Sequence, residues 1–104
     1  MAFRVRWTPE ALDDVLRLQD FLIERALVRD GDLHLAERAT AAIEQGIEFL
    51  KQSPFSCRKA DQGPFLRELI IPFGHTGYVA LFEITDANHV VIVAVRHQRE
   101  SDYH

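Results

Sequence analysis

The sequence predicts an α+β fold, and three observations lead to this class. Two long segments, 9–29 and 32–52, carry apolar residues at steps of three and four, which is the spacing of an amphipathic helix. Three later segments are rich in β-branched and aromatic residues, as strands are: 64–71, 77–85 and 89–95. Short links ("PFGHTG" and "DAN") separate those strands, and short links join antiparallel neighbours. We therefore expect an antiparallel two-helix hairpin, then a three-stranded antiparallel meander, with the helices packed on one sheet face.

A short N-terminal strand precedes the first helix. In "FRVRW" apolar and basic residues alternate, which is the pattern of a half-buried strand with Phe3, Val5 and Trp7 facing inward. Thr8 follows where a side-chain oxygen can accept a hydrogen bond from the first helical turn. Pro9 fits the first helical position, because its missing N–H loses no hydrogen bond there. The first helix is therefore expected to begin at Pro9.

The two helices differ in the width of their apolar faces. The first helix has one stripe made of Ala11, Val15, Leu18, Leu22 and Ala26. Beside it runs a second stripe made of Leu12, Leu16, Ile23 and Leu27. An arc this wide predicts a helix that packs against two neighbours, the second helix and the sheet. The second helix ends at Ser53-Pro54, and its expected buried residues are Leu35, Ala36, Ala39, Ile43, Ile47 and Leu50.

Both faces of the predicted meander are apolar. In its second strand Tyr78, Ala80, Phe82 and Ile84 oppose Val79 and Leu81. In its third strand Val91, Val93 and Val95 oppose Val90, Ile92 and Ala94. One helix hairpin covers one face. If several hundred Å² of the other face stay exposed to water, the fold lacks on the order of 10 kcal/mol of stabilisation from apolar burial. We therefore expect another polypeptide across the far face. The alternative is a strongly curled sheet filled from its loops by Phe55, Phe65 and Phe73.

Composition narrows the class of protein. The whole chain, residues 1–104, has the length and apolar content of a single globular domain. Its longest apolar run, Val90 to Val95, is far shorter than the ~20 residues that cross a bilayer, so we expect a cytoplasmic protein without a membrane partner. A net charge of −4 argues against general binding of nucleic acid. The single cysteine, Cys57, forms no internal disulfide, and His34, His75 and His89 lack metal-ligand spacing, so neither metal nor cofactor is expected.

Several segments, in order along the chain, resemble one known superfamily. They are "WTPEALDDV", a helix ending "FLKQSPF", "LRELIIPF", "GYVALFEI" and "VIVAVRHQRE". Together they resemble the RelE/ParE superfamily of toxins from bacterial type II toxin–antitoxin systems. The most specific elements are "REL" at Arg67–Leu69 and "VRHQRE" at Val95–Glu100. The resemblance implies a RelE/ParE-like fold and a cognate antitoxin whose C-terminal segment wraps the toxin as a hetero-oligomer.

The superfamily divides by activity. The resemblance implies either a RelE-like nuclease that cuts mRNA on the ribosome, or a ParE-like inhibitor of DNA gyrase. RelE-like chains are usually basic and carry an arginine after the aromatic that opens the central strand. This chain is acidic and has Val79 at that place, so the ParE-like branch fits better. We then expect a protein that is not an enzyme. The alternatives are an endoribonuclease and a non-toxic interaction module.

The turn "DAN" sets the expected register of the last two strands. If it is a three-residue turn with Thr85 opposite His89, then Tyr78 lies opposite Arg96. A slip of one residue would move every side chain beyond it to the other face. The expected site therefore depends on this turn.

The register of the first two meander strands adds a second cation. If Ile71 lies opposite Tyr78, then Arg67 lies opposite Phe82, on the face that also holds Tyr78 and Arg96. That face would receive an acidic stretch of an antitoxin or contact the target. The expected partner- or target-binding residues are Arg67, Tyr78, Phe82, Arg96, His97 and Arg99. If the chain is a nuclease, the catalytic residues would be Arg67, Arg96, His97 and Tyr103.

Structural roles are the alternatives for these residues. Arg67 can instead pair with Glu83 or Glu68, or extend into solvent. Glu68 is expected on the other face in a structural ion pair. Arg99 and Tyr103 can belong to a frayed tail.

Overall fold

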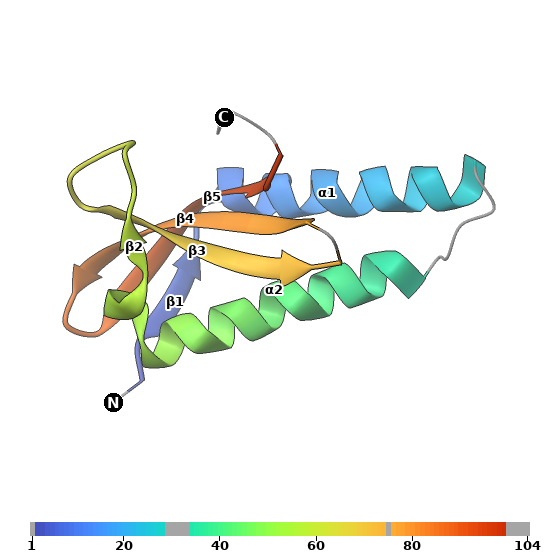
Figure 1. Cartoon of the computed structure of the whole chain (residues 1–104). Helices are drawn as coiled ribbons and strands as arrows, with labels where there is room; N and C mark the ends of the chain where they lie inside the picture. The colour runs from blue at the N-terminus through green and yellow to red at the C-terminus, as the bar shows by residue number, and fades with distance from the viewer. Residues whose placement is uncertain (1, 29–33, 75, 100–104) are drawn as a thin grey trace.

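The computed structural model describes residues 2–28, 34–74 and 76–99. Over these residues an α+β fold forms, as the sequence predicts (Figure 1). The helices are α1 (Pro9–Val28), α2 (His34–Gln52) and the 3₁₀ helix η1 (Pro54–Ser56). The strands are β1 (Arg4–Trp7), β2 (Arg58–Lys59), β3 (Leu66–Phe73), β4 (Thr76–Asp86) and β5 (His89–His97). The expectations for His75, Tyr103 and the start of the second helix at residue 32 lie outside the described residues.

The described strands form one sheet in the order β1-β5-β4-β3-β2. The β3–β4–β5 part is the antiparallel meander that the short links predict. The N-terminal strand β1 pairs with β5 in parallel, and the short strand β2 continues the sheet beyond β3. The sequence predicted no strand at the place of β2. It identified β1 but not its parallel pairing with β5.

The start of α1 follows the predicted capping pattern. The Ala11 N–H donates to Thr8 Oγ1 at 3.1 Å, and the helix begins at Pro9. Thr8 also joins the helix to β5, because its N–H donates to the Ile92 carbonyl and its hydroxyl to the Val93 carbonyl. This end of α1 is therefore fixed to the middle of β5.

One sheet face carries the main core, and both helices cover it. From the helices come Ala11, Leu18, Ala39, Ile43, Ile47 and Leu50, and from the strands Leu69, Ile71, Tyr78, Ala80, Phe82, Val90, Ile92 and Val95. The predicted buried face of α2 is confirmed, with Leu35 partly exposed. In Figure 1 the tip of the β3–β4 hairpin points into the space between the two helices.

The far face of the sheet is buried at its centre, although Ile70 of β3 on the same face is 37 % exposed, so the centre needs no partner to cover it. Val79 and Ala94 are each 1 % exposed, and Leu81 is 5 % exposed. Leu81 and Ala94 pack with Ala60, Leu66 and Val93 in a second, smaller cluster. The alternative of aromatic filling is wrong as well, because Phe55 and Phe65 are exposed and Phe73 packs on the helix side.

A β-bulge in β5 overturns part of the expected register. From Ile84 opposite Val90 to Phe82 opposite Ile92, the pairing is the one that the sequence analysis expected. At Val93 one extra residue enters β5, and the turn itself has Asp86 opposite His89. Beyond the bulge, Tyr78 lies opposite His97 and not Arg96. Val95 therefore joins the helix side and Arg96 turns to the far face.

The second apolar stripe of α1 does not pack as predicted. Leu12, Leu16, Ile23 and Leu27 are 50 %, 56 %, 40 % and 70 % exposed. The helix buries Ala11 and Leu18 instead, with Val15 and Leu22 partly covered. The helix hairpin lies on the sheet as a single layer, so this outer side meets no other described element. No described helix is long and apolar enough to span a membrane.

Candidate functional site

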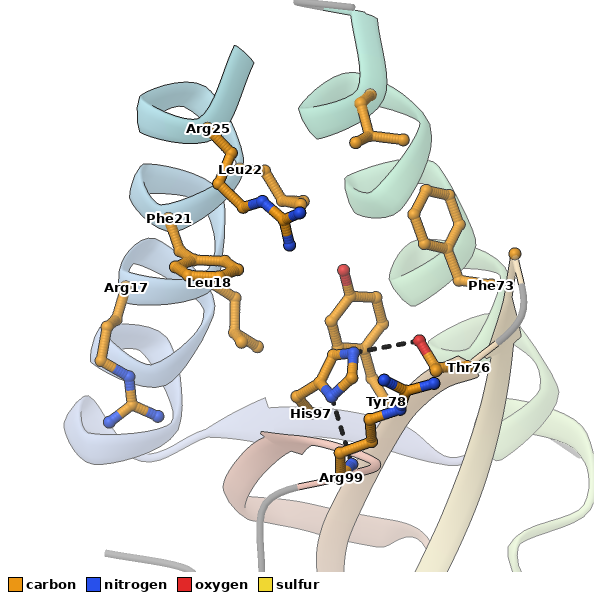
Figure 2. Close-up of a pocket in the computed structure, with 12 residues that line it drawn as sticks. Arg17, Leu18, Phe21, Leu22, Arg25, Phe73, Thr76, Tyr78, His97 and Arg99 are labelled. Atoms are coloured by element: carbon orange, nitrogen blue, oxygen red, sulfur yellow. Dashed lines mark hydrogen bonds between the residues drawn. The ribbon is translucent and has the colours of Figure 1, made fainter. Parts of the chain in front are cut away.

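A groove of about 750 Å³ opens between α1 and the end of the sheet where the β3–β4 hairpin turns. Figure 2 shows it between the two helices, with Tyr78 and His97 at its floor. The lining residues are Arg17, Leu18, Phe21, Leu22, Arg25, Leu35, Phe73, Gly74, Thr76, Tyr78, His97 and Arg99. The groove thus contains three of the residues that the sequence analysis proposed: Tyr78, His97 and Arg99.

Aromatic contacts build the groove floor. The Tyr78 ring stacks on Phe73, with centroids 5.9 Å apart, and meets the His97 ring edge-on at 5.8 Å. The bulge at Val93 creates this arrangement, because it brings His97 opposite Tyr78. Burial raises the pKa of the Tyr78 phenol above its ordinary value, so the phenol enters the groove as a neutral hydroxyl.

Hydrogen bonds hold the His97 ring at both nitrogens (Figure 2). The backbone N–H of Arg99 donates to Nδ1 at 3.1 Å, so Nδ1 is an acceptor. In the neutral ring the proton therefore sits on Nε2, which lies 3.0 Å from Thr76 Oγ1 and donates to it. The lone pair that a general base would use is engaged by the backbone.

The rim of the groove is cationic. Arg17, Arg25 and Arg99 stand around it, and none of the described lining residues is acidic. Arg25 lies over the Phe21 ring, 5.6 Å from its centroid. Arg17 contacts the buried Asp14 carboxylate at 3.5 Å while its own side chain is 58 % exposed. An apolar floor with a cationic rim suits an apolar segment that carries carboxylates.

Arg67 and Phe82 lie away from this groove. They face each other across β3 and β4, as predicted, but Phe82 is fully buried in the core and cannot be a binding residue. Arg67 donates to the Cys57 carbonyl at 2.6 Å and to the Phe55 carbonyl at 3.4 Å, and its guanidinium lies over the Phe55 ring. It therefore fixes the chain after α2, and the alternative of a pair with Glu83 or Glu68 is wrong.

Arg96 lies on the opposite sheet face from the groove. Its guanidinium contacts Glu68 at 3.8 Å and donates to the carbonyls of His97 and Gln98. Glu68 also lies 3.8 Å from Arg58, so its predicted structural ion pair on the other face is confirmed. The expected convergence of Arg67, Tyr78 and Arg96 does not occur.

The contribution of α1 to the groove was not predicted from the sequence. Arg17, Phe21 and Arg25 follow one another at steps of four and so share one helix face. This face lies beside the predicted apolar stripe of Leu18 and Leu22. A large aromatic between two arginines at that spacing is the signal that was available.

Comparisons with known proteins agree with this fold. The model of a protein family described as the ParE toxin of the type II toxin–antitoxin system parDE matches residues 5–102. Among solved structures, a chain of a chromosomal ParDE toxin–antitoxin system from P. aeruginosa superposes with a TM-score of 0.68 at 16 % sequence identity. The match covers 92 % of this chain and 96 % of that chain. No curated protein sequence matches. Because the family model spans nearly the whole chain, this protein belongs to the ParE toxin family of type II toxin–antitoxin systems.

Proposed function

We propose that this ParE-family chain inhibits DNA gyrase in the cytoplasm when it is free, and that a cognate antitoxin neutralises it by laying an acidic, apolar segment into the groove. The observation that carries the antitoxin part is the charge of the groove. Three arginines surround an apolar floor in a chain whose net charge is −4. Gyrase is the target that the resemblance to ParE-like toxins implies, and inhibition by binding needs no catalytic group.

Burial and charge explain why such a segment would bind. Phe21 is 53 % exposed at the groove wall, and an apolar side chain from a partner would cover it. Carboxylates beside that side chain would meet the guanidiniums of Arg25 and Arg99, which offer paired donors to carboxylate oxygens. Segments of this kind order on binding, so the antitoxin tail needs no fold of its own.

The arrangement of the polar residues disfavours the alternative of an RNA-cleaving enzyme. Cleavage by 2′-hydroxyl attack needs a base, an acid and a cation around one phosphate. Arg67 and Arg96 lie on opposite sheet faces and contact backbone carbonyls. His97 accepts a backbone N–H at Nδ1. Tyr103 lies outside the described residues.

Expression of the free chain in bacteria tests the target. Gyrase inhibition predicts loss of plasmid supercoiling, a DNA-damage response and filamentation, and purified chain should block supercoiling by gyrase in vitro. Cut messenger RNA with an early loss of translation would instead identify a RelE-like nuclease. Normal growth at full expression would indicate that the chain is a non-toxic interaction module.

Co-expression with the neighbouring open reading frame tests the antitoxin site. Phe21→Asp should weaken the complex for two reasons. It removes an apolar contact from the groove, and its carboxylate would repel the acidic groups of the antitoxin segment. Leu12→Asp is the matched control, since Leu12 has a similar exposure of 50 % but lies half a turn round the same helix. Equal affinity of the Phe21→Asp and Leu12→Asp chains for the antitoxin would reject the groove as its binding site.

A further inference from the structure

The outer face of α1 carries a continuous apolar stripe that the groove does not use. The stripe consists of Leu12, Leu16, Ile23 and Leu27, all 40–70 % exposed. At 3.6 residues per turn these four side chains fall within an arc of about 60°. The buried residues Ala11 and Leu18 point about 140° away from the centre of that arc. The stripe therefore faces outward from the sheet over most of the length of the helix.

The stripe is separate from the groove. Phe21 follows Leu12 by nine residues, which places it about 180° round the helix. Arg17 and Arg25 lie one turn before and after Phe21 and so belong to the groove side. A partner in the groove and a partner on the stripe would occupy opposite sides of α1.

Acidic residues border the stripe on the groove side of α1. Asp13, Asp20 and Glu24 are all exposed, and they lie about 20–60° beyond Leu27 round the helix. Asp13 directly follows Leu12, and Asp20 precedes Ile23 by three residues. The two acids therefore lie beside different parts of the stripe along its length.

The opposite border of the stripe, formed by α2, is acidic too. Gln19, which lies between Leu16 and Ile23 on this side of α1, donates to Thr40 Oγ1 of α2 at 2.7 Å. Glu37 and Glu44 lie one turn before and after Thr40, and both are exposed. The Glu37 carboxylate also contacts the exposed ring of His34 at 3.3 Å.

We propose that this acid-bordered stripe docks an amphipathic helix of a partner protein whose apolar face is flanked by lysines or arginines. An exposed apolar helix face is a common binding surface for a partner helix. Complementary charges along both borders select the partner and its orientation. A second copy of this chain is the poorer occupant, because two stripes packed together would oppose acids with acids. The antitoxin segment proposed for the groove has the opposite charge, so the two surfaces attract different ligands.

A pair of synthetic helices tests the proposal on the full chain. One peptide has leucines on one face flanked by lysines, and its matched partner has glutamates in place of the lysines. Fluorescence anisotropy should show binding of the lysine peptide, weakening with added salt, and little binding of the glutamate peptide. Leu16→Gln with Ile23→Gln should weaken the lysine peptide about tenfold or more, and Asp20→Lys with Glu44→Lys should reverse the preference between peptides. All four positions are exposed, and circular dichroism checks that the variants fold.

Antitoxin affinity, measured on the same variants, separates this proposal from the one above. It should stay unchanged in both double variants, whereas Phe21→Asp should weaken the antitoxin and leave the lysine peptide unaffected. A loss of antitoxin affinity in the Leu16 and Ile23 double variant would overturn the inference, because the stripe would then belong to the antitoxin interface. Sedimentation showing a wild-type dimer that this double variant dissolves would also overturn it, in favour of a second copy. Equal binding of the lysine peptide to wild type and both variants would show that the peptide does not use the stripe.

Discussion

The buried carboxylate of Asp14 accepts a hydrogen bond from the backbone N–H of Val95 at 2.9 Å. The two residues are 81 positions apart in the chain, and Asp14 is 4 % exposed. The pairing of β1 with β5 ends at Trp7 opposite Ile92, so the edge of β5 beyond that point needs other hydrogen-bond partners. Thr8 and Asp14 of the following helix segment supply them, on either side of the bulge at Val93.

Removal of the Asp14 carboxylate should destabilise the fold. Asp14→Ala leaves the Val95 N–H without this acceptor in the interior, which costs about 1–3 kcal/mol of unfolding free energy. Asp14→Asn keeps an oxygen acceptor and should lose less. Urea denaturation of the purified chain measures both. Asp13→Ala, at an exposed neighbouring position, is the control and should change stability by less than about 0.5 kcal/mol. Equal losses in the Asp13 and Asp14 alanine variants would contradict the role given to this hydrogen bond.

The sequence predicted the elements better than the contacts between them. The cap at Thr8, the start of α1 at Pro9 and the buried face of α2 follow from local spacing, and the structure confirms them. Parallel pairing of β1 with β5 joins segments at opposite ends of the chain, so no local pattern reports it. The two-residue strand β2 is too short to show any periodicity.

The candidate site was predicted only in part, because one bulge decides it. Side chains alternate along a strand, so the extra residue at Val93 exchanges the faces of Arg96 and His97. The bulge is accompanied by bonds from Thr8 and Asp14, which are distant in sequence. The far face was expected to be more exposed than it is. The side chains of Glu68 and Arg96, which are 11 % and 15 % exposed, lie beside the apolar residues there and cover part of them.

Loss of the Arg67 guanidinium should loosen the segment after α2. Arg67→Met keeps a long apolar stem but removes the hydrogen bonds to the carbonyls of Cys57 and Phe55. We expect about 1–3 kcal/mol of destabilisation and a faster reaction of the buried Cys57 thiol with a disulfide reagent. Lys59→Met, at an exposed position of β2, is the matched control. Toxicity lost without a change in stability or thiol reactivity would show that Arg67 contacts the target instead.

Gly77 has no room for a side chain, whereas Gly74 in the same hairpin has room but a left-handed backbone. A Cβ at Gly77 would collide with the backbone carbonyl oxygen of Ile71, so Gly77→Ala should cost about 2 kcal/mol or more in unfolding free energy. Gly74 has a φ of +60° with open space around it, so Gly74→Ala costs about 1 kcal/mol from backbone strain alone. Thermal or urea denaturation ranks the two variants. The Gly77 variant should also weaken antitoxin binding, because the hairpin carries Phe73 and Thr76 into the groove. The reverse stability ranking would show that β3 and β4 are not paired as described.

Alkaline pH should destabilise the chain through two buried acids that prefer to stay protonated. Burial raises the pKa of the Cys57 thiol above its ordinary value of 9.0, with Arg67 partly opposing the shift, and burial also raises the pKa of the Tyr78 phenol above 10.0. The unfolded chain releases these protons at lower pH than the folded chain. The stabilisation is therefore complete below the pKa of each group in the unfolded chain, and it is lost as the pH rises toward the pKa in the folded chain. Urea denaturation from pH 8 upward should therefore show a declining unfolding free energy, first from Cys57 and then from Tyr78. Tyr78→Phe should make the decline above about pH 10 shallower, and Cys57→Ala should do so from about pH 9, whatever either change does to stability at neutral pH. A pH profile that keeps the same slope in both variants would mean that neither group is as buried as its packing indicates.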